Sequence, residues 1–341
     1  MKKSLMTLGV LALFVLMAYG QEKKFALYSV AFYNMENLFD TIHDEGKNDY
    51  EYLPNGTNQW NTMKYKAKLK NMSEILSLLS TDKLPMGPAI IGVSEIENYR
   101  VLEDILKQPA LADRGYQYVH YEGEDQRGVD CAFFYNPKLF ELTNSKLVPY
   151  VYINDTIHKT RGFLIASGNI AGEKMHFIVN HWPSRAAASP ARERAGEQVR
   201  AIKDSLLRED SAAKIVIMGD MNDDPMDKSM AVALGAKRKP VDAGPTDLYN
   251  PWWDTLKKGY GTLMYKGKWN LFDQIVFTGN LLGTDRSTLK FYKHEIFRRD
   301  FMFQKEGKYK GYPKRTQAGG VWLNGYSDHL PTIIYLIKEM K

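Results

Sequence analysis

Carboxylate, amide and imidazole side chains follow one apolar run after another along this 341-residue chain. These polar residues are Asn34, Glu36, Glu95, Asn180, His181, Asp220, Asn222, Asp273, Asp328 and His329. Each alone would be an ordinary turn or cap residue, because Asp and Asn are common at strand ends. In a layered α/β fold, however, strand ends meet at one edge, and functional side chains gather there. The recurrence therefore predicts that these residues converge on one site.

The chemistry of this set is that of hard oxygen donors. Its metal-binding candidates are Glu95, Glu36, Asn34 and Asp328, and neither a cysteine nor a triad of clustered histidines accompanies them. Such donors favour Mg²⁺, with Mn²⁺ or Ca²⁺ as alternatives, over structural zinc. A hard divalent ion beside two histidines and several amides indicates phosphate chemistry. The ion would neutralise phosphoryl oxygens while a carboxylate activates water for in-line attack.

The elements that must position these residues are short. Buried strands are predicted over residues 26–33, 89–94, 129–135, 162–170, 175–180, 214–218, 272–277 and 332–337. Apolar residues recur at helical spacing over 69–79, and residues 191–208 form a second predicted helix. No fixed-period repeat is visible. This pattern favours an α/β fold in which two sheets pack face to face with helices outside.

Composition agrees with a globular chain. Hydrophobic residues make up 44% and charged residues 25%, which excludes a disordered or fibrous protein. The formal net charge is +6, so the chain is mildly basic. The single cysteine, Cys131, cannot form an internal disulfide, and its apolar neighbours predict a buried, inert thiol.

The first twenty residues resemble a secretory signal peptide. Lys2 and Lys3 precede an apolar run over 5–17, and Ala18 and Gly20 form a small-residue cleavage site. A membrane anchor is the alternative, but the run is shorter than the roughly 20 residues of a spanning helix. We therefore expect residues 21–341 to be one domain that is exported to the periplasm or medium as a monomer without stable membrane insertion.

Six segments, in this order, resemble the motifs of the endonuclease/exonuclease/phosphatase superfamily. They are residues 32–38 (FYNMENL), 92–98 (GVSEIEN), 179–185 (VNHWPSR), 219–223 (GDMND), 272–275 (FDQI) and 327–331 (SDHLP). Any one motif is weak, but six in family order are specific. The resemblance covers about residues 26–338 and is to the exonuclease III and deoxyribonuclease type, in an exported bacterial form. It implies a four-layer α/β/β/α sandwich of two mixed β-sheets flanked by helices, and metal-dependent phosphoester hydrolysis.

The resemblance also implies roles for the first half of the site. Glu95 matches the metal-binding glutamate of the family, and Asn34, Glu36 and Asp328 match positions that ligate or border the metal. Glu36 stands where the apurinic endonucleases have aspartate, so its reach toward the metal differs.

Catalytic and phosphate-binding roles follow from the same motifs. Asp220 matches the aspartate that activates the attacking water, and His329 matches the active-site histidine with Asp273 as its carboxylate partner. His181 matches a further histidine of the deoxyribonuclease and sphingomyelinase branches. The predicted phosphate-binding residues are Asn222, Asn180, Arg185 and Arg127. For Arg127 a solvated turn arginine is an equal alternative.

One basic segment bears on the substrate. Residues 286–315 hold ten Lys or Arg against three Asp or Glu, interleaved with seven Phe and Tyr. The segment could bind a nucleic-acid backbone and stack bases. The alternative, which we weight slightly more, is a lysine-rich loop that packs its rings against the edge of the sandwich.

The sequence as a whole predicts an exported, divalent-metal-dependent phosphodiester hydrolase. A nuclease that acts on DNA or RNA is the leading interpretation. A phosphatase or a sphingomyelinase-like lipid phosphodiesterase, acting on a small phosphorylated substrate, is the alternative. A non-catalytic binding protein on the same fold is disfavoured, because every expected catalytic position is present.

Overall fold

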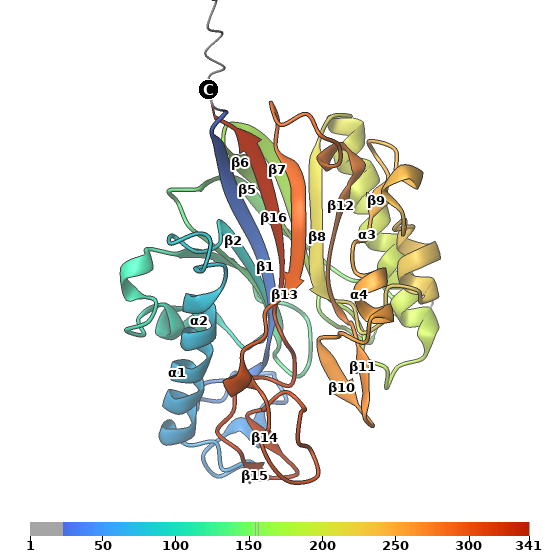
Figure 1. Cartoon of the computed structure of the whole chain (residues 1–341). Coiled ribbons are helices and arrows are strands. Elements are labelled where there is room, and N and C mark those ends of the chain that lie inside the picture. Colours follow the sequence, from blue (N-terminus) through green and yellow to red (C-terminus); the bar gives the residue numbers. More distant parts are fainter. Residues whose placement is uncertain (1–22, 154, 156, 341) are drawn as a thin grey trace, which may run out of the picture.

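The computed structural model describes residues 23–153, 155 and 157–340. The predicted signal peptide lies outside these residues. Two six-stranded sheets form the centre of the described chain, with helices on their outer sides (Figure 1). The α-helices are α1 (Thr62–Leu78), α2 (Tyr99–Leu106), α3 (Ser189–Glu209) and α4 (Trp253–Lys257). No helix within the described ranges is long and apolar enough to cross a membrane.

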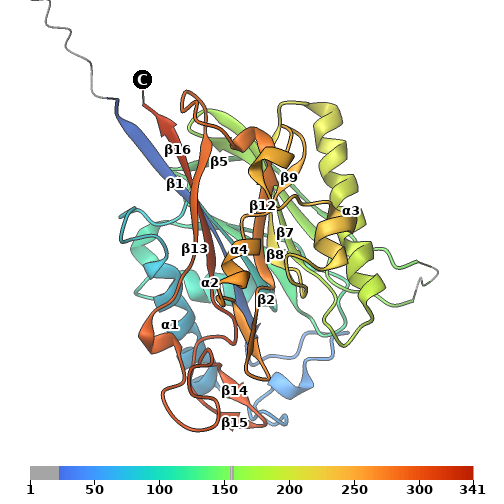
Figure 2. The ribbon, with the colours of Figure 1, turned by 45° about the vertical axis from the view of Figure 1, so that its right-hand side comes forward.

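The first sheet has the strand order β13-β16-β1-β2-β4-β3. Its strands are β1 (Phe25–Leu38), β2 (Ile90–Ile96), β3 (Gln117–His120), β4 (Asp130–Tyr135), β13 (Lys290–Ile296) and β16 (Thr332–Glu339). β1 runs parallel to β2 and antiparallel to β16. Phe25 pairs with Glu339, so the first and last strands of the described chain lie side by side (Figure 2).

The second sheet has the order β5-β6-β7-β8-β12-β9. Its strands are β5 (Phe140–Val148), β6 (Phe163–Ile170), β7 (Glu173–His181), β8 (Lys214–Asp220), β9 (Leu248–Tyr249) and β12 (Asp273–Thr278). Only β7 and β8 are parallel neighbours in this sheet, and α3 is the crossover that a parallel pair requires.

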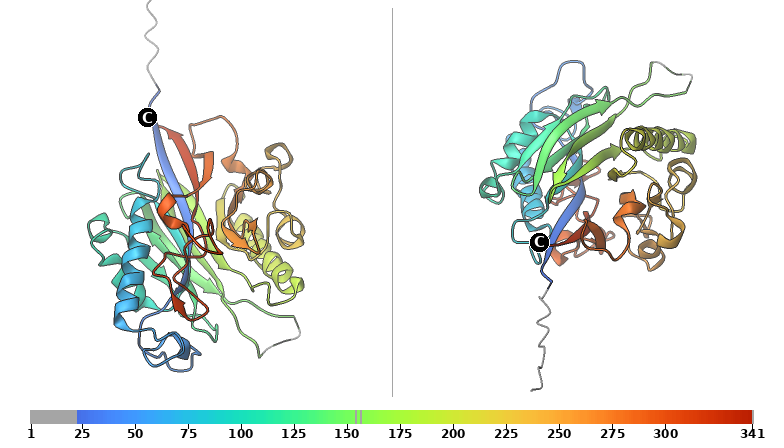
Figure 3. Two further views of the ribbon diagram at one scale, coloured as in Figure 1. Left: turned by 60° about the horizontal axis from the view of Figure 1, so that its bottom comes forward. Right: turned by 90° about the horizontal axis from the view of Figure 1, so that it is seen from above.

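Three apolar cores separate four layers. Phe133 and Phe177 belong to the core between the two sheets, where their rings lie 5.8 Å apart. Helices α1 and α2 pack on the outer face of the first sheet, and α3 packs on the outer face of the second. Figure 3 shows these helices on opposite sides of the sheets. The predicted α/β/β/α sandwich is therefore confirmed.

Local sequence signals explain where the main helices begin. Asn61 caps α1 by accepting a hydrogen bond from the backbone N–H of Lys64 at 3.1 Å. Asn98, within one of the six motifs, caps α2 in the same way. Pro190 lies in the first turn of α3, where its missing N–H costs nothing.

Shorter elements complete the chain. Two small hairpins consist of β10 (Leu263–Tyr265) with β11 (Lys268–Asn270), and of β14 (Gln317–Ala318) with β15 (Val321–Trp322). Short 3₁₀-helices span Tyr50–Tyr52, Ala112–Arg114, Pro240–Asp242, Gly279–Leu281 and Asp300–Met302, and a π-helix spans Ser229–Leu234. These pieces lie in the connections between the larger elements.

The sequence-based strand assignment missed the half-exposed strands. β5 and β13 consist mainly of intermediate and exposed positions instead of apolar runs, because each is an edge strand of its sheet. β1 continues to Leu38, five residues beyond its predicted end, and its pairing with β2 shifts register after Asn34. Strand irregularities of this kind re-aim side chains, and here they occur where the polar residues begin.

Candidate active site

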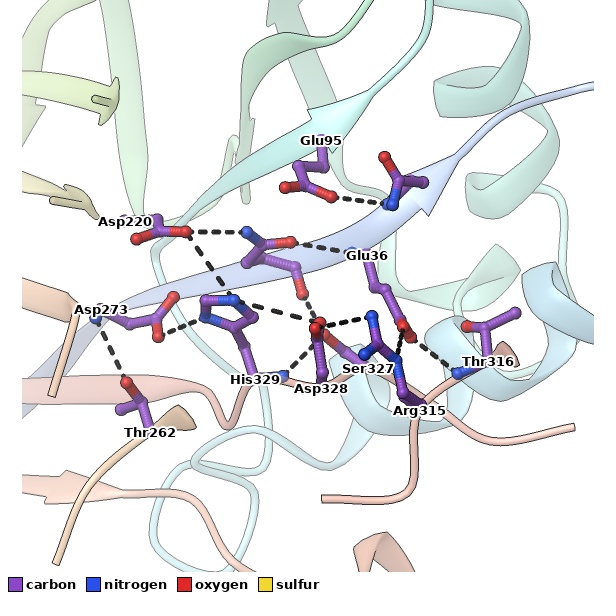
Figure 4. Close-up of polar contacts among 12 residues, drawn as sticks. Glu36, Glu95, Asp220, Thr262, Asp273, Arg315, Thr316, Ser327, Asp328 and His329 are labelled. Atoms are coloured by element: carbon purple, nitrogen blue, oxygen red, sulfur yellow. Dashed lines mark hydrogen bonds and ion pairs between the residues drawn. The ribbon is translucent and has the colours of Figure 1, made fainter. Parts of the chain in front are cut away.

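The predicted site residues meet at one end of the sandwich because strand register brings them together. Asp220 ends β8, and it pairs with His181 on β7 and with Asp273 on β12. Residues paired directly across neighbouring strands point to the same face, so these three side chains project together. The ends of β1 and β2 and the turn before β16 face them from the first sheet (Figure 4).

His329 is held through both its ring and its backbone. Its Nδ1 lies 2.7 Å from Oδ2 of Asp273, and its backbone N–H donates to the Ser327 hydroxyl at 3.0 Å. Burial disfavours the imidazolium, but the carboxylates of Asp273 and Asp220 outweigh burial and raise the pKa of His329 well above its usual range. The two carboxylates therefore favour the imidazolium form of the ring.

Asp220 occupies the centre of the site. Its Oδ2 accepts a hydrogen bond from Asn34 Nδ2 at 3.0 Å, and its Oδ1 accepts one from the backbone N–H of Asn222 at 2.9 Å. His329 Nε2 lies 3.8 Å from Oδ2. Burial, only partly offset by His329, raises the pKa of Asp220 from 3.8 to about 7. A carboxylate with a pKa near neutrality is suited to accept a proton from water.

His181 is buried between two carboxylates. Its Nε2 lies 3.7 Å from both Glu95 Oε1 and Asp220 Oδ2, which is too long for a direct hydrogen bond. The carboxylates favour the imidazolium, but burial and the positive charge of Arg161 prevail and lower the pKa of His181 well below its usual range. Its Nδ1 has no partner among the described residues. The neutral ring can therefore donate or accept at the centre of the site.

Four site residues adopt left-handed backbone angles that non-glycine residues rarely use. The φ angles are 46° at Glu36, 53° at Asn37, 59° at Glu95 and 52° at Asn222. Such strain persists where the surroundings enforce it, and it is common at functional sites. The backbone N–H of Asn37 donates to Glu95 Oε2 at 2.9 Å. The strained segments thus fix the position of the Glu95 carboxylate.

Glu36 and Asp328 are joined by an arginine from the basic segment. Arg315 Nε donates to Glu36 Oε1 at 2.8 Å, and Arg315 Nη2 lies 2.9 Å from Asp328 Oδ2. The other oxygen of Glu36 accepts the backbone N–H of Thr316 at 2.7 Å. Burial and the nearby Asp328 raise the pKa of Glu36 to about 7. Figure 4 shows the guanidinium between the two carboxylates.

Two asparagines of the predicted phosphate-binding set have different surroundings. Asn222 Nδ2 donates to the carbonyl of Trp182 at 3.0 Å, and its backbone N–H donates to Asp220 Oδ1 at 2.9 Å. Asn180 is fully buried, and its Nδ2 donates to the carbonyls of Ile178 and Met218 at 3.0 and 3.1 Å. Asn222 is therefore tied to Asp220 through its backbone, whereas the Asn180 amide is used by buried carbonyls. Phosphate binding by these two residues stays a prediction.

The two predicted phosphate-binding arginines both have protein partners. Arg127 Nη2 donates to Asn37 Oδ1 at 2.7 Å, and the backbone N–H of Asn37 in turn donates to Glu95 Oε2. Arg185 Nη2 lies 2.8 Å from Asp227 Oδ2, and its guanidinium lies 4.4 Å from the centre of the Phe272 ring. Of the two, Arg127 lies on the Glu95 side of the site, and Arg185 is committed to an acidic loop.

Five Lys and Arg side chains of the basic segment have partners that lie away from the site. They are Arg286, Lys290, Lys293, Arg298 and Arg299, bound to carbonyls, carboxylates or aromatic rings. Arg298, for example, lies 5.0 Å from the ring centres of Trp269 and Phe303. Three lysines, Lys305, Lys308 and Lys310, are exposed. The packed-loop interpretation therefore describes these five cations, while Tyr292, Phe301 and Tyr309 of the same segment are exposed like the three lysines.

The free oxygens at the site fit a hard divalent ion. Glu95 Oε1 and Asp328 Oδ1 make no hydrogen bond to any described residue; His181 Nε2 lies 3.7 Å from the first and His329 Nε2 lies 4.0 Å from the second. Buried Asp273 Oδ1 also has no partner within the described ranges. A separate group, Asp220, Asp273 and His329, places ligand atoms within 4.8 Å of one another, but both Asp220 oxygens and His329 Nδ1 are already engaged in the contacts given above. Unsatisfied carboxylate oxygens in this number favour Mg²⁺ or a similar cation.

Sequence reasoning did not single out four residues that shape this site. They are Arg315, Lys68, Asn37 and Ser327. Arg315 was visible only as one of ten cations in the basic segment, and Lys68 only as part of the polar side of a helix. Asn37 and Ser327 lie inside quoted motifs. Their place in those motifs was the one available signal.

A sequence model of the Endonuclease/Exonuclease/phosphatase family matches residues 29–338, and the chain belongs to this family. Members of this superfamily are divalent-metal-dependent phosphoesterases. No curated protein sequence matches the chain. Family membership and the fold therefore agree with the site chemistry described above.

Three solved structures show the same fold at low sequence identity. An endonuclease/exonuclease/phosphatase family protein from Bacteroides thetaiotaomicron is 15% identical, with a TM-score of 0.57, covering 93% of this chain and 97% of its own. A mannosyl-6-phosphatase from the same organism is 15% identical, with a TM-score of 0.56 and coverages of 91% and 99%. D. rerio TDP2 complexed with single-strand DNA product is 14% identical, with a TM-score of 0.53 and coverages of 91% and 99%.

Proposed function

We propose that this member of the endonuclease/exonuclease/phosphatase family hydrolyses a phosphate ester by in-line attack of water, with Mg²⁺ as its metal. The observation that carries the proposal is the position of Asp220. It is a buried carboxylate with a pKa near 7, hydrogen-bonded to Asn34 and backed by His329. A carboxylate poised near the working pH is an efficient general base.

A bound divalent ion would neutralise phosphoryl charge and stabilise the leaving oxyanion. Glu95 and Asp328 supply the free oxygens that would hold it, with Asn34 and Glu36 beside them. Asp220 accepts the proton of the attacking water. Asn222 binds a phosphoryl oxygen without repelling it, because an amide carries no charge. Protonated His329 faces the same point through Nε2 and stabilises the negative charge that develops there.

The proposed substrate is nucleic acid, with a small phosphorylated molecule as the second candidate. Support for nucleic acid comes from the mild positive charge of the chain, from the exposed lysines 305, 308 and 310, and from the TDP2 structure with its DNA product. The second candidate is favoured by the engagement of five segment cations away from the site. The mannosyl-6-phosphatase neighbour points the same way.

Parallel assays distinguish these substrates. Plasmid DNA, RNA, sphingomyelin, a bis-aryl phosphate and a sugar phosphate are incubated with the chain and Mg²⁺, with EDTA and the Asp220→Asn variant as controls. Turnover of any one that needs both the metal and Asp220 supports phosphoester hydrolysis. The absence of turnover on all five would contradict the proposal.

A salt series then tests nucleic acid as the ligand. Binding of a short duplex to the Asp220→Asn variant should weaken by roughly 0.9 log unit of affinity per log unit of salt for each phosphate contacted. A steep slope supports several backbone contacts. A flat response, or no binding at low salt, favours the small substrate.

We further propose that the chain is exported and cleaved near Gly20. The support is the basic, apolar and small-residue order of the first twenty residues. Mass spectrometry of the periplasmic fraction and the medium should find a chain that begins near Gln21. A chain with intact Met1 in the membrane fraction would contradict export.

A further inference from the structure

Arg315 is anchored at two points inside the candidate site. Its Nε donates to Glu36 Oε1 at 2.8 Å and its Nη2 lies 2.9 Å from Asp328 Oδ2, as Figure 4 shows. Glu36 lies on β1, and Asp328 lies in the turn four residues before the start of β16. The guanidinium therefore bridges two neighbouring strands of the first sheet at their site-facing ends.

A buried lysine holds the backbone beside Arg315. Lys68 of α1 is fully buried, and its Nζ donates to the Thr316 hydroxyl and to the carbonyl of Tyr326 at 2.7 Å. The same ammonium group lies 3.9 Å from Glu36 Oε2. Glu36 therefore has a second cation and the Thr316 N–H as partners. It does not depend on Arg315 alone for charge compensation.

The guanidinium keeps donor capacity that the protein does not use. Arginine has five N–H groups, and the two contacts above engage Nε and Nη2. No hydrogen bond from Nη1 is found among the described residues, and the side chain is 43% exposed. Arg315 also lines a polar cavity of about 200 Å³ together with Asn37, Gly319 and Gly320. Glu36 and Glu51 also line this cavity, so a fixed cation with free donors faces open space beside the Glu36 end of the site.

We propose that Arg315 binds the phosphoryl group of the substrate through this unused edge of its guanidinium. The inference rests on the proposed function and names a residue that positions the substrate in it. Guanidinium forks suit phosphate oxygens because two parallel N–H groups match their spacing. Glu36 and Asp328 hold the fork in place before substrate arrives, so little side-chain freedom is lost on binding. The positive charge also offsets the surrounding carboxylates, which would otherwise repel the anion.

The test measures binding of inorganic phosphate by calorimetry, in Mg²⁺ and in EDTA, with wild type, Arg315→Gln, Arg315→Lys and Arg299→Gln. Arg299 is a matched control because it belongs to the same basic segment but pairs with Asp82. Arg315→Gln should weaken phosphate binding by about 10- to 100-fold, the range for lost charge-assisted hydrogen bonds. The KM for the phosphate ester that the protein hydrolyses should rise by a similar factor. Arg315→Lys should be intermediate, and Arg299→Gln should match wild type.

Two results would overturn the inference. One is wild-type phosphate affinity and KM in a folded Arg315→Gln chain. The other is tighter Mg²⁺ binding and higher activity in that variant, because Arg315 would then occupy the place of the ion. If Arg315→Gln does not fold, Arg315→Lys provides the test. Phosphate affinity and KM equal to those of wild type in Arg315→Lys would overturn the proposed bidentate contact. A wild type that binds phosphate through Arg315 but cleaves no ester would contradict the proposed function and leave this inference standing.

Discussion

His329 Nδ1 and Asp273 Oδ2 lie 2.7 Å apart, in a site where neither side chain is more than 8% exposed. The contact fixes the ring orientation, so Nε2 points toward Asp220 at 3.8 Å. It also supplies the largest of the influences that keep the buried ring protonated. Asp273 thereby determines both the direction and the charge of the histidine.

Asp273→Asn should lower kcat by at least about 10²-fold, because the histidine loses the charge that keeps it protonated. As pH rises, the variant should lose its remaining activity at a lower pH than wild type does. The reason is that the pKa of His329 falls, so the ring deprotonates earlier. The measurement is kcat against pH for both proteins. Identical pH profiles would show that Asp273 does not control the protonation of His329.

Asp220→Asn should lower the chemical rate by about 10²-fold or more, the usual loss when a general base is removed. Single-turnover kinetics in saturating Mg²⁺ isolates this step from substrate binding. In wild type the rate should rise with pH as Asp220 ionises, because only the ionised carboxylate accepts a proton. A variant that keeps a wild-type rate would exclude Asp220 as the base.

Asp220 should also make stability depend on pH in the metal-free protein. Its folded pKa of about 7 exceeds its ordinary value of 3.8, so the folded state holds the proton more tightly. The associated stability is complete below pH 4 and is lost as pH rises through 7. The loss is at most about 4 kcal/mol, at 1.36 kcal/mol per pKa unit. Denaturant unfolding in EDTA from pH 4.5 to 8 should show a shallower decline for Asp220→Asn.

Glu95→Gln should reduce Mg²⁺ affinity by at least about 10-fold, because loss of even an outer partner of a metal ligand costs 10- to 100-fold. Excess Mg²⁺ should restore part of the rate. Glu97→Gln is the matched control. Glu97 accepts the Asp40 N–H, and burial raises its pKa to about 9, so it is neutral at pH 7. If calorimetry gives Glu95→Gln and Glu97→Gln the same Mg²⁺ affinity, Glu95 is not a metal ligand.

Cys131 should not react with a thiol reagent while the protein is folded. It is 5% exposed in the core between the sheets, and burial raises the pKa of its thiol well above the usual range. Labelling should therefore begin only as denaturant unfolds the chain. Rapid labelling of the native protein would show that this core opens.

The fold class and most of the site could be predicted from sequence because both depend on local patterns. Apolar runs mark strands that are buried on both faces, such as residues 214–218 within β8. The polar residues that end them, Asp220 among them, fall on the edge where strands of a sandwich finish. Edge strand β13 escaped the same reasoning, because a half-exposed strand carries no apolar run.

Only the tertiary structure decided which polar groups are free to act. Arg315 and Glu36 are 279 residues apart in sequence and 2.8 Å apart in space, and no periodicity links them. Asn180 belongs to a site motif, yet its amide is used by buried carbonyls. Local patterns specify which residues are buried and on which face they lie. The partner of a polar side chain depends instead on packing between distant elements. That packing places Arg315 at the site and pairs other arginines of the same segment, such as Arg299, with residues elsewhere.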